Sequence, residues 1–323
     1  METKRTLISV VIPNYNRAET VGQAIDSILA QRVNADIEII IGDDCSTDNA
    51  REILQKYKEH YPNIINLILQ EENIGLGANW AICIKACRGK YICNCDNDDY
   101  WHNPDKLQIQ LDYMETHPES NVLITNHRTH NRITGEILEK EAFVDRSIPL
   151  VDAIMQGRTS FCNATVMYKS SFLADHLNLD DYIKYRFTLQ DWNTWALLAP
   201  WTNFDFIPNS TATFGIETAS ITRPESYEKL ASRIRREKET YLYVCNHLPL
   251  KYHYSATDAE WERYVNDRLL SMACRRCDYK NAKVFAHKAN IDNKKKRFAS
   301  NPVSFFAYCF LASIKRLANK NRY

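Results

Sequence analysis

Four short apolar runs alternate with amphipathic segments in the N-terminal third of the chain. Residues at helical spacing follow the first run, as Val21, Ile25 and Ile28 show. Buried strands that alternate with helices form a mostly parallel sheet with right-handed crossovers. We therefore expect an α/β fold in which a mostly parallel, mixed sheet is flanked by helices. The predicted strands cover residues 7–13, 37–41, 64–69 and 91–95.

The overall composition limits the classes of protein that the chain can represent. Its 323 residues suffice for one large core or two modest ones, and 45% hydrophobic and 25% charged residues are typical of a globular protein. A net charge of +1 argues against a surface built for nucleic acid, so no such partner is expected. Ten cysteines and a start without a secretory segment predict reduced thiols and a cytoplasmic location.

The pattern changes along the rest of the chain. A helix is predicted over residues 188–198, and from Tyr227 onward the sequence is typical of successive helices rich in Arg, Lys and Tyr. We therefore expect two domains, residues 1–220 and a helical C-terminal extension of residues 221–323. Further strands are predicted at residues 121–125, 164–168 and 203–208.

Basic residues surround an aromatic run near the C-terminus. The run covers residues 303–311, and the bases lie at residues 294–297 and 315–322. No apolar run reaches the ~18 residues that a membrane span requires, but this arrangement suits an anionic lipid surface. A terminal helix that packs its aromatic side on the protein's own core is the alternative. Peripheral contact with the inner face of the cell membrane is thus one of two expectations for this tail.

Three carboxylates, Asp96, Asp98 and Asp99, follow the fourth apolar run within four residues. A buried strand that stops at clustered carboxylates places them at the carboxyl edge of a sheet, where open α/β folds bind ligands. Carboxylates held this close repel one another, and a hard divalent cation such as Mg²⁺ or Mn²⁺ relieves the repulsion. A solvated acidic turn is the alternative. The apolar strand before the cluster and the helix that Pro104 is expected to open after it favour the metal site.

A second acidic turn, Asp43-Asp44, ends the second apolar run. A carboxylate at a strand end can accept a hydrogen bond from a uracil N3–H or a ribose hydroxyl, and the other acidic cluster can hold a metal against a diphosphate. A dinucleotide-binding domain would require Gly-x-Gly-x-x-Gly after the first strand, where this chain has residues 13–16 with the sequence Pro-Asn-Tyr-Asn. A nucleotidyltransferase also uses paired carboxylates and a metal, but no glycine-rich phosphate loop is visible.

The two acidic turns, together with the segment Ser9–Arg17, resemble family 2 of the inverting glycosyltransferases, which have the GT-A fold. The resemblance covers roughly residues 5–215 and rests on several motifs in order. It implies a metal-dependent, inverting transfer of a sugar from a nucleotide-sugar, with UDP as the expected nucleotide, to a hydroxyl acceptor. It also implies a glycan or lipid-linked acceptor and a part in building a cell-surface polysaccharide.

The resemblance implies a role for each matching residue. Asp191 matches the catalytic base of the family. The expected cofactor is Mn²⁺ or Mg²⁺. Its expected ligands are Asp99, Asp98 and Asp96, with Asp99 as the first choice. The nucleotide contacts are expected at Pro13, Asn14, Tyr15, Asn16, Asp44 and Asp98. The acceptor side is expected at Asn163, Gln190 and Trp192.

The chemistry of such a transfer agrees with these roles, because a carboxylate takes the proton of a sugar hydroxyl and a divalent metal stabilises the departing diphosphate. For Asp191 alone, the alternative is an acid that interacts with its own helix N-terminus. Three positions depart from the family pattern: Cys45 stands where glycine is usual, no arginine precedes Asn79, and Gln190 replaces the first acid of a pair. A catalytically silent relative that binds a nucleotide-sugar or a partner protein therefore stays as the alternative function.

Overall fold

The computed structural model describes residues 6–216, 226–249 and 256–289. The described chain divides into two compact units, one holding the residues up to 216 with 247–249 and the other holding the remainder. The predicted domain boundary at residue 220 lies outside the described residues, so it stays a prediction.

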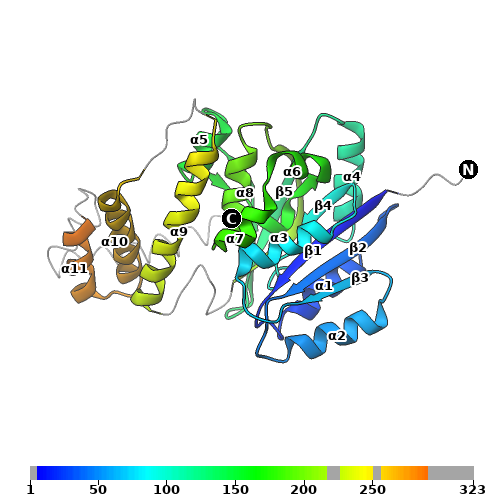
Figure 1. Ribbon diagram of the computed structural model, residues 1–323, viewed down its shortest axis with the longest axis horizontal. Coiled ribbons are helices and arrows are strands. Elements are labelled where there is room, and N and C mark those ends of the chain that lie inside the picture. The colour runs from blue at the N-terminus through cyan, green and yellow to red at the C-terminus, as the bar shows by residue number, and fades with distance from the viewer. Residues whose placement is uncertain (1–5, 217–225, 250–255, 290–323) are drawn as a thin grey trace, which may run out of the picture. The chain divides into compact units, whose positions relative to one another are not determined.

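The first unit is built on an eight-stranded sheet (Figure 1) with the strand order β10-β5-β9-β4-β1-β2-β3, and β6 pairs with β5. Strand β9 runs antiparallel to β4 and β5, β6 is antiparallel to β5, and the other pairs are parallel. The expected mixed, mostly parallel sheet is thus confirmed. The strands are β1 (Leu7–Asn14), β2 (Asp36–Asp43), β3 (Ile65–Leu69), β4 (Tyr91–Asn94), β5 (Val122–Asn131), β6 (Glu136–Lys140), β9 (Met167–Lys169) and β10 (Asp205–Ile216), with a separate pair β7 (Phe143–Val144) and β8 (Thr159–Ser160).

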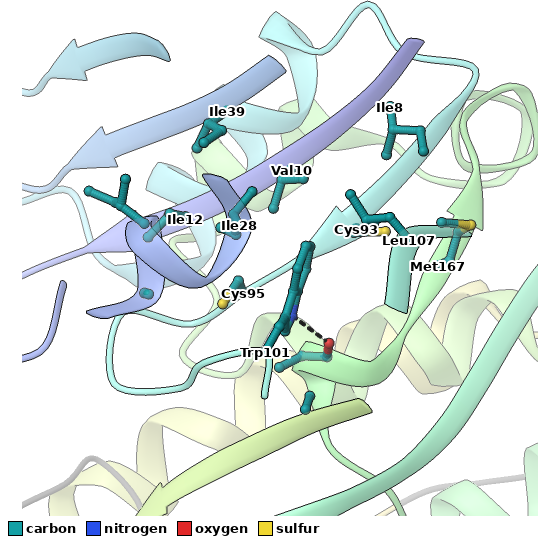
Figure 2. Close-up of a cluster of buried hydrophobic side chains, with 14 of the residues drawn as sticks. Ile8, Val10, Ile12, Ile28, Ile39, Cys93, Cys95, Trp101, Leu107 and Met167 are labelled. Atoms are coloured by element: carbon teal, nitrogen blue, oxygen red, sulfur yellow. Dashed lines mark hydrogen bonds between the residues drawn. The ribbon is translucent and has the colours of Figure 1, made fainter. Parts of the chain in front are cut away.

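Helices cover the sheet on both faces (Figure 1). Alternate residues of β1 pack in one core with α1 and α4, and these residues are Ile8, Val10 and Ile12. Helix α3 contacts strands β1 and β2. Figure 2 shows Trp101 in that core, where its indole N–H donates to the carbonyl of Ala164 at 3.0 Å. The helices are α1 (Val21–Leu29), α2 (Ala50–His60), α3 (Leu76–Ala86), α4 (Lys106–Thr116), α5 (Leu150–Met155), α6 (Ser170–His176), α7 (Leu179–Tyr185) and α8 (Gln190–Leu198), with a short 3-10 helix η1 (Asn163–Thr165).

Two predicted strands differ from those in the structure. Residues 164–168 begin with the turn of η1, and β9 keeps only the last part of the predicted strand. Strand β10 starts near the predicted strand 203–208 but continues well beyond it. Its pairing with β5 shifts register between Ile207 and Ser210, where Pro208 has no N–H to donate.

The start of α2 also differs from the prediction. The sequence alone offers Ser46 or Thr47 as the N-cap of this helix, but α2 begins at Ala50 with Asn49 in the N-cap position. The hydroxyl of Ser46 instead donates to the carboxylate of Asp43 at 2.5 Å. Ser46 therefore stabilises the acidic turn before α2 and does not cap the helix.

Among its described residues the second unit contains three helices, α9 (Tyr227–His247), α10 (Asp258–Arg275) and α11 (Tyr279–Ala289), as the sequence from Tyr227 onward predicts. Thr257 and Glu260 form a capping box at the start of α10. Within the described ranges, no helix combines the length and the apolar character that crossing a membrane requires. The predicted basic aromatic tail lies outside the described residues.

Candidate active site

Three neighbouring strands place their carboxyl ends at one edge of the sheet. Asn14 at the end of β1 lies opposite Asp43 at the end of β2, and Val11 lies opposite Asn94 at the end of β4. Because the three strands are parallel, the turns that follow them gather at the same edge. The two acidic turns of the sequence therefore belong to one region of the protein.

The side chain of Asn14 connects these turns. Its Nδ2 donates to Asp43 Oδ1 at 2.8 Å, and its Oδ1 accepts from Nδ2 of Asn97 at 3.0 Å. Asn14 is buried, so this amide holds the turn after β2 against the turn after β4. Its direct contact with a nucleotide stays a prediction.

The remaining members of the 13–16 turn differ in accessibility. Pro13 is buried, whereas 44% of the Tyr15 side chain is exposed. Asn16 has a positive φ of 49°, and its Oδ1 accepts the backbone N–H of Thr47 at 2.7 Å. A pocket beside this turn is lined by Asn16, Thr20 and Asp48 among others. Tyr15 is therefore the most exposed member of the turn, and Asn16 is the member that lines the pocket.

Asp43 is held as an anion by its neighbours. Burial raises the pKa of this carboxyl, but hydrogen bonds from Ser46, Arg51 and Asn14 outweigh burial and lower the pKa below its usual range. Nε of Arg51 lies 2.6 Å from Asp43 Oδ2. The first acid of the pair thus organises the turn.

Asp44 binds the loop between β3 and α3. Its Oδ1 accepts the backbone N–H of Ile74 at 2.7 Å, and its Oδ2 accepts that of Gly75 at 2.9 Å. Burial raises the pKa of Asp44, and the two hydrogen bonds lower it in part. A carboxylate oxygen has two lone pairs, so the predicted contact of Asp44 with a base or ribose is compatible with these bonds.

The side chain of Asp99 is buried and hydrogen-bonded inside the protein. Its Oδ1 accepts the backbone N–H of Gly215 at 2.9 Å, and the thiol of Cys162 donates to its Oδ2 at 3.4 Å. Only 1% of the residue is exposed. Burial and the nearby charges of Asp96 and Asp98 raise its pKa well above the usual range. Asp99 therefore ties the acidic turn to β10 and η1.

Asp96 and Asp98 are partly exposed. Nε of Arg17 lies 3.6 Å from Asp98 Oδ2, and Nδ2 of Asn163 lies 3.2 and 3.3 Å from the two oxygens of Asp96. Burial, and then the negative charges of Asp98 and Asp191, raise the pKa of Asp96 to about 7. These two carboxylates are the members of the cluster that a ligand can approach.

Asp191 lies in the first turn of α8 and is partly exposed. Its Oδ1 accepts the backbone N–H of Trp192 at 2.6 Å, which is the kind of helix-end contact named above as the alternative for this residue. Burial raises the pKa of Asp191, and its charge in turn acts on Asp96. The structure thus brings Asp191 near the acidic turn, although about a hundred residues separate them in sequence.

The three predicted acceptor residues also lie around this turn or on α8. Asn163 contacts Asp96, Gln190 is buried, and Trp192 donates its indole N–H to the carbonyl of Ile154 at 3.4 Å. Oε1 of Gln190 has no hydrogen-bond partner in the described part of the chain. This unsatisfied oxygen belongs to the residue directly before Asp191. Acceptor binding stays a prediction.

The donor atoms at this edge fit a hard cation. Oxygens of Asp96 and Asp98 are the ligands that Mg²⁺ and Mn²⁺ prefer. In the described ranges no group of three or more His, Cys, Asp or Glu side chains is arranged to hold a metal. Metals of this type are often bound by one or two carboxylates together with substrate phosphates, so a complete protein cage is not required.

Two residues that sequence reasoning did not identify clamp the acidic turn. Arg132 Nη2 donates to the backbone carbonyl of Asp98 at 3.0 Å. A Cβ added at Gly215 would lie 2.2 Å from that same oxygen, so only glycine permits this approach. No local pattern signals either contact, because β5 and β10 meet the turn only in the folded protein.

The sheet, its flanking helices and the acidic turns at the strand ends are those of the GT-A fold. The chain belongs to glycosyl transferase family 2, whose sequence model matches residues 9–196, more than half of the chain.

Curated relatives and solved structures agree with this assignment. The putative glycosyltransferase EpsE of Bacillus subtilis is 32% identical over 164 residues, which cover 51% of this chain and 56% of that protein. The uncharacterized protein Rv1520 of Mycobacterium tuberculosis is 41% identical over 115 residues, or 36% of this chain and 33% of that protein. The matched segment thus spans a third to somewhat over half of these relatives.

Solved structures share the fold at low sequence identity. Staphylococcus aureus TarS 1–349 in complex with UDP-GlcNAc superposes with a TM-score of 0.55 at 17% identity, over 90% of each chain. The mannosyltransferase PcManGT of Pyrobaculum calidifontis, in complex with GDP-Man and Mn²⁺, gives a TM-score of 0.51 at 15% identity, over 98% of this chain and 88% of that one.

Proposed function

We propose that this protein transfers a sugar from a UDP-sugar to a hydroxyl acceptor, with a divalent metal and with inversion at the anomeric carbon. The observation that carries the proposal is that the acidic turns after β2 and β4 lie at one edge of the sheet, where the charge of Asp191 also raises the pKa of Asp96. The proposed base and the proposed metal-binding turn are thus neighbours. That combination suits attack by a hydroxyl on a sugar whose diphosphate departs.

In this proposal Asp98 and Asp96 bind the metal, because their carboxylates are partly exposed. Asp99 positions the turn through Gly215 and Cys162. This order differs from the sequence-based one, which placed Asp99 first. When bound, the metal would stabilise the negative charge that develops on the leaving diphosphate.

Asp191 would act as the general base. Burial raises its pKa, which makes the carboxylate a better proton acceptor at neutral pH. As the acceptor oxygen forms its bond to the anomeric carbon, a carboxylate oxygen of Asp191 takes the hydroxyl proton. Attack on the face opposite the diphosphate inverts the anomeric centre. Gln190, which directly precedes Asp191 on α8, would lie on the acceptor side.

The proposed donor nucleotide is UDP. Tyr15 would stack on the base, and Asp44 would accept a hydrogen bond from uracil or ribose. TarS has been solved in complex with UDP and with UDP-GlcNAc, which supports uridine, whereas PcManGT has been solved with GDP-Man. Guanosine is therefore the competing outcome when the nucleotides are compared.

The proposed setting is cell-surface polysaccharide synthesis on a glycan or lipid-linked acceptor, at the inner face of the cell membrane. The support comes from relatives that match parts of the chain. They include a putative teichuronic acid biosynthesis glycosyltransferase, TuaG of Bacillus subtilis, at 37% identity over 114 residues, and a poly(ribitol-phosphate) beta-glucosyltransferase of Bacillus spizizenii, at 39% identity over 94 residues.

The donor assignment is tested by thermal unfolding with UDP, GDP, CDP or dTDP, each with and without Mn²⁺. A ligand at about a hundred times its Kd adds roughly 2.7 kcal/mol to the free energy of unfolding, which is a readily measured shift. We expect stabilisation by UDP that requires Mn²⁺ and is lost in Asp98→Ala. A preference for GDP would overturn the uridine assignment, and no response to any nucleotide would overturn the proposed function.

The catalytic assignment is tested with Asp191→Asn. This variant keeps the size of the side chain but removes the base, so we expect transfer from the preferred donor to fall by about a hundredfold or more. Binding of the nucleotide with Mn²⁺ should be unchanged, because Asp191 is not a proposed donor ligand. Normal transfer by Asp191→Asn would remove this residue from the mechanism. Lack of transfer by the wild type, with normal donor binding, would favour the catalytically silent alternative.

A further inference from the structure

A chain of hydrogen bonds runs through the interior from α3 to Asp96. Nε1 of Trp80 donates to Asn94 Oδ1 at 3.0 Å, and Nδ2 of Asn94 donates to Asn163 Oδ1 at 3.1 Å. Nδ2 of Asn163 then lies 3.2 and 3.3 Å from the two oxygens of Asp96. Trp80 and Asn94 are each 1% exposed, and Asn163 is 5% exposed. Trp80, Asn94 and Asn163 together form what we call the amide relay.

The direction of the amide relay follows from its first member. An indole N–H can only donate a hydrogen bond, whereas the two ends of an asparagine amide have the same shape and opposite hydrogen-bonding character. Trp80 therefore turns the oxygen of Asn94 toward itself and the NH₂ of Asn94 toward Asn163. The oxygen of Asn163 accepts that bond, which leaves the NH₂ of Asn163 facing Asp96.

We propose that Trp80 and Asn94 are positioning residues that, through Asn163, fix the carboxylate of Asp96 for binding the metal–nucleotide donor. This inference rests on the proposed glycosyltransferase function. The NH₂ of Asn163 spans both oxygens of Asp96, so it occupies the side between them and leaves their outer lone pairs for a ligand. A reversed Asn163 amide would set its oxygen against the carboxylate, which is costly in a buried site.

Burial gives the relay its effect. Because water cannot replace a lost partner at Trp80 or Asn94, an amide without its indole donor is free to reverse or is left unsatisfied. Partners behind a metal-binding side chain change metal affinity by about 10- to 100-fold in other proteins when they are removed. Trp80 also packs on Tyr182 with ring centroids 5.3 Å apart, a contact that phenylalanine largely keeps.

The first test compares Trp80→Phe with Trp195→Phe. Trp195 is a second buried indole, and its Nε1 donates to the hydroxyl of Tyr168 at 2.8 Å, outside the relay. Both variants lose one buried N–H bond and ring volume, so both should lose stability. Only Trp80→Phe should weaken binding of UDP with Mn²⁺, by about tenfold in calorimetry. Equal binding by the wild type and Trp80→Phe would overturn the proposal.

A double-mutant cycle separates a relay from independent structural effects. In the Asn163→Ala background the relay no longer reaches Asp96, so adding Trp80→Phe should weaken donor binding no further. Additive losses would mean that Trp80 acts by another route, and they would overturn the proposal.

A second readout does not need a nucleotide. In protein labelled with ¹⁵N at asparagine, the side-chain amide signals of Asn94 and Asn163 should both shift in Trp80→Phe and stay in place in Trp195→Phe. Unchanged Asn163 signals in Trp80→Phe would show that no relay exists. If the wild type binds no nucleotide with Mn²⁺, the proposed function fails, and the role of the relay in donor binding fails with it. A loss of donor binding that occurs in Trp80→Phe and not in Trp195→Phe supports both the proposed function and the relay.

Discussion

Cys45 occupies a backbone position that suits glycine. Its φ of 60° lies in the left-handed region, which costs a residue with a Cβ about 1 kcal/mol. Glycine is usual at this position in the family. We expect Cys45→Gly to be more stable toward urea than Cys45→Ala by about 1 kcal/mol, because both variants lose the thiol but only glycine removes the strain.

The comparison with alanine also accounts for the Cys45 thiol, which donates to the carbonyl of Glu71 at 3.4 Å. If Cys45→Ala and Cys45→Gly had the same free energy of unfolding, the positive φ would not be a source of strain. Cysteine in place of glycine at position 45 thus lowers the stability of the turn beside Asp44. It need not indicate a lost nucleotide site.

At the scale of the elements, β10 holds the acidic turn through Gly215. Its N–H donates to Asp99 Oδ1 at 2.9 Å, and a Cβ there would lie 2.2 Å from the carbonyl oxygen of Asp98. Because that obstacle is backbone, Gly215→Ala must move the turn. We expect a loss of about 1–3 kcal/mol in the free energy of unfolding, together with weaker binding of the nucleotide with Mn²⁺ in titration calorimetry.

Gly157→Ala is the matched control. Gly157 has a positive φ of 66°, which Gly215 does not have, and nothing lies within 4 Å of its added Cβ. We expect this variant to lose about 1 kcal/mol of stability through strain alone, with unchanged donor binding. If Gly157→Ala weakened donor binding as much as Gly215→Ala does, the clamp on the acidic turn would not be the cause.

The order of the elements was predictable because apolar periodicity is local. The place of Asp96 and Asp98 directly after a buried strand was predictable for the same reason. The role of Asp191 came from the family resemblance, and it stays a prediction. Partners such as Gly215 and Trp80 were not predictable, since their spacing to the acidic turn has meaning only after the sheet has formed. Ser46 looked like a helix cap for a related reason: its hydroxyl had two candidate partners, and only the fold decided between them.

At the scale of the whole molecule, the sheet depends on β5, which pairs with β6, β9 and β10. His127 on β5 is buried, and burial, followed by the charge of Lys140, lowers the pKa of its imidazole from 6.5 to about 4, while Glu139 acts in the opposite direction. Nδ1 of His127 has no hydrogen-bond partner among the described residues. The imidazole of His127 is therefore neutral in the folded protein at neutral pH.

This burial predicts how the stability of the protein depends on pH. Between pH 6.5 and about 4 the unfolded chain binds a proton at His127 that the folded chain does not, so the contribution of His127 to stability falls as the pH falls. Between pH 7.5 and pH 5 this loss amounts to about 2 kcal/mol. We expect urea unfolding of His127→Phe to lose about 2 kcal/mol less than the wild type over that interval. Parallel losses in the two proteins would mean that His127 is protonated in the folded state.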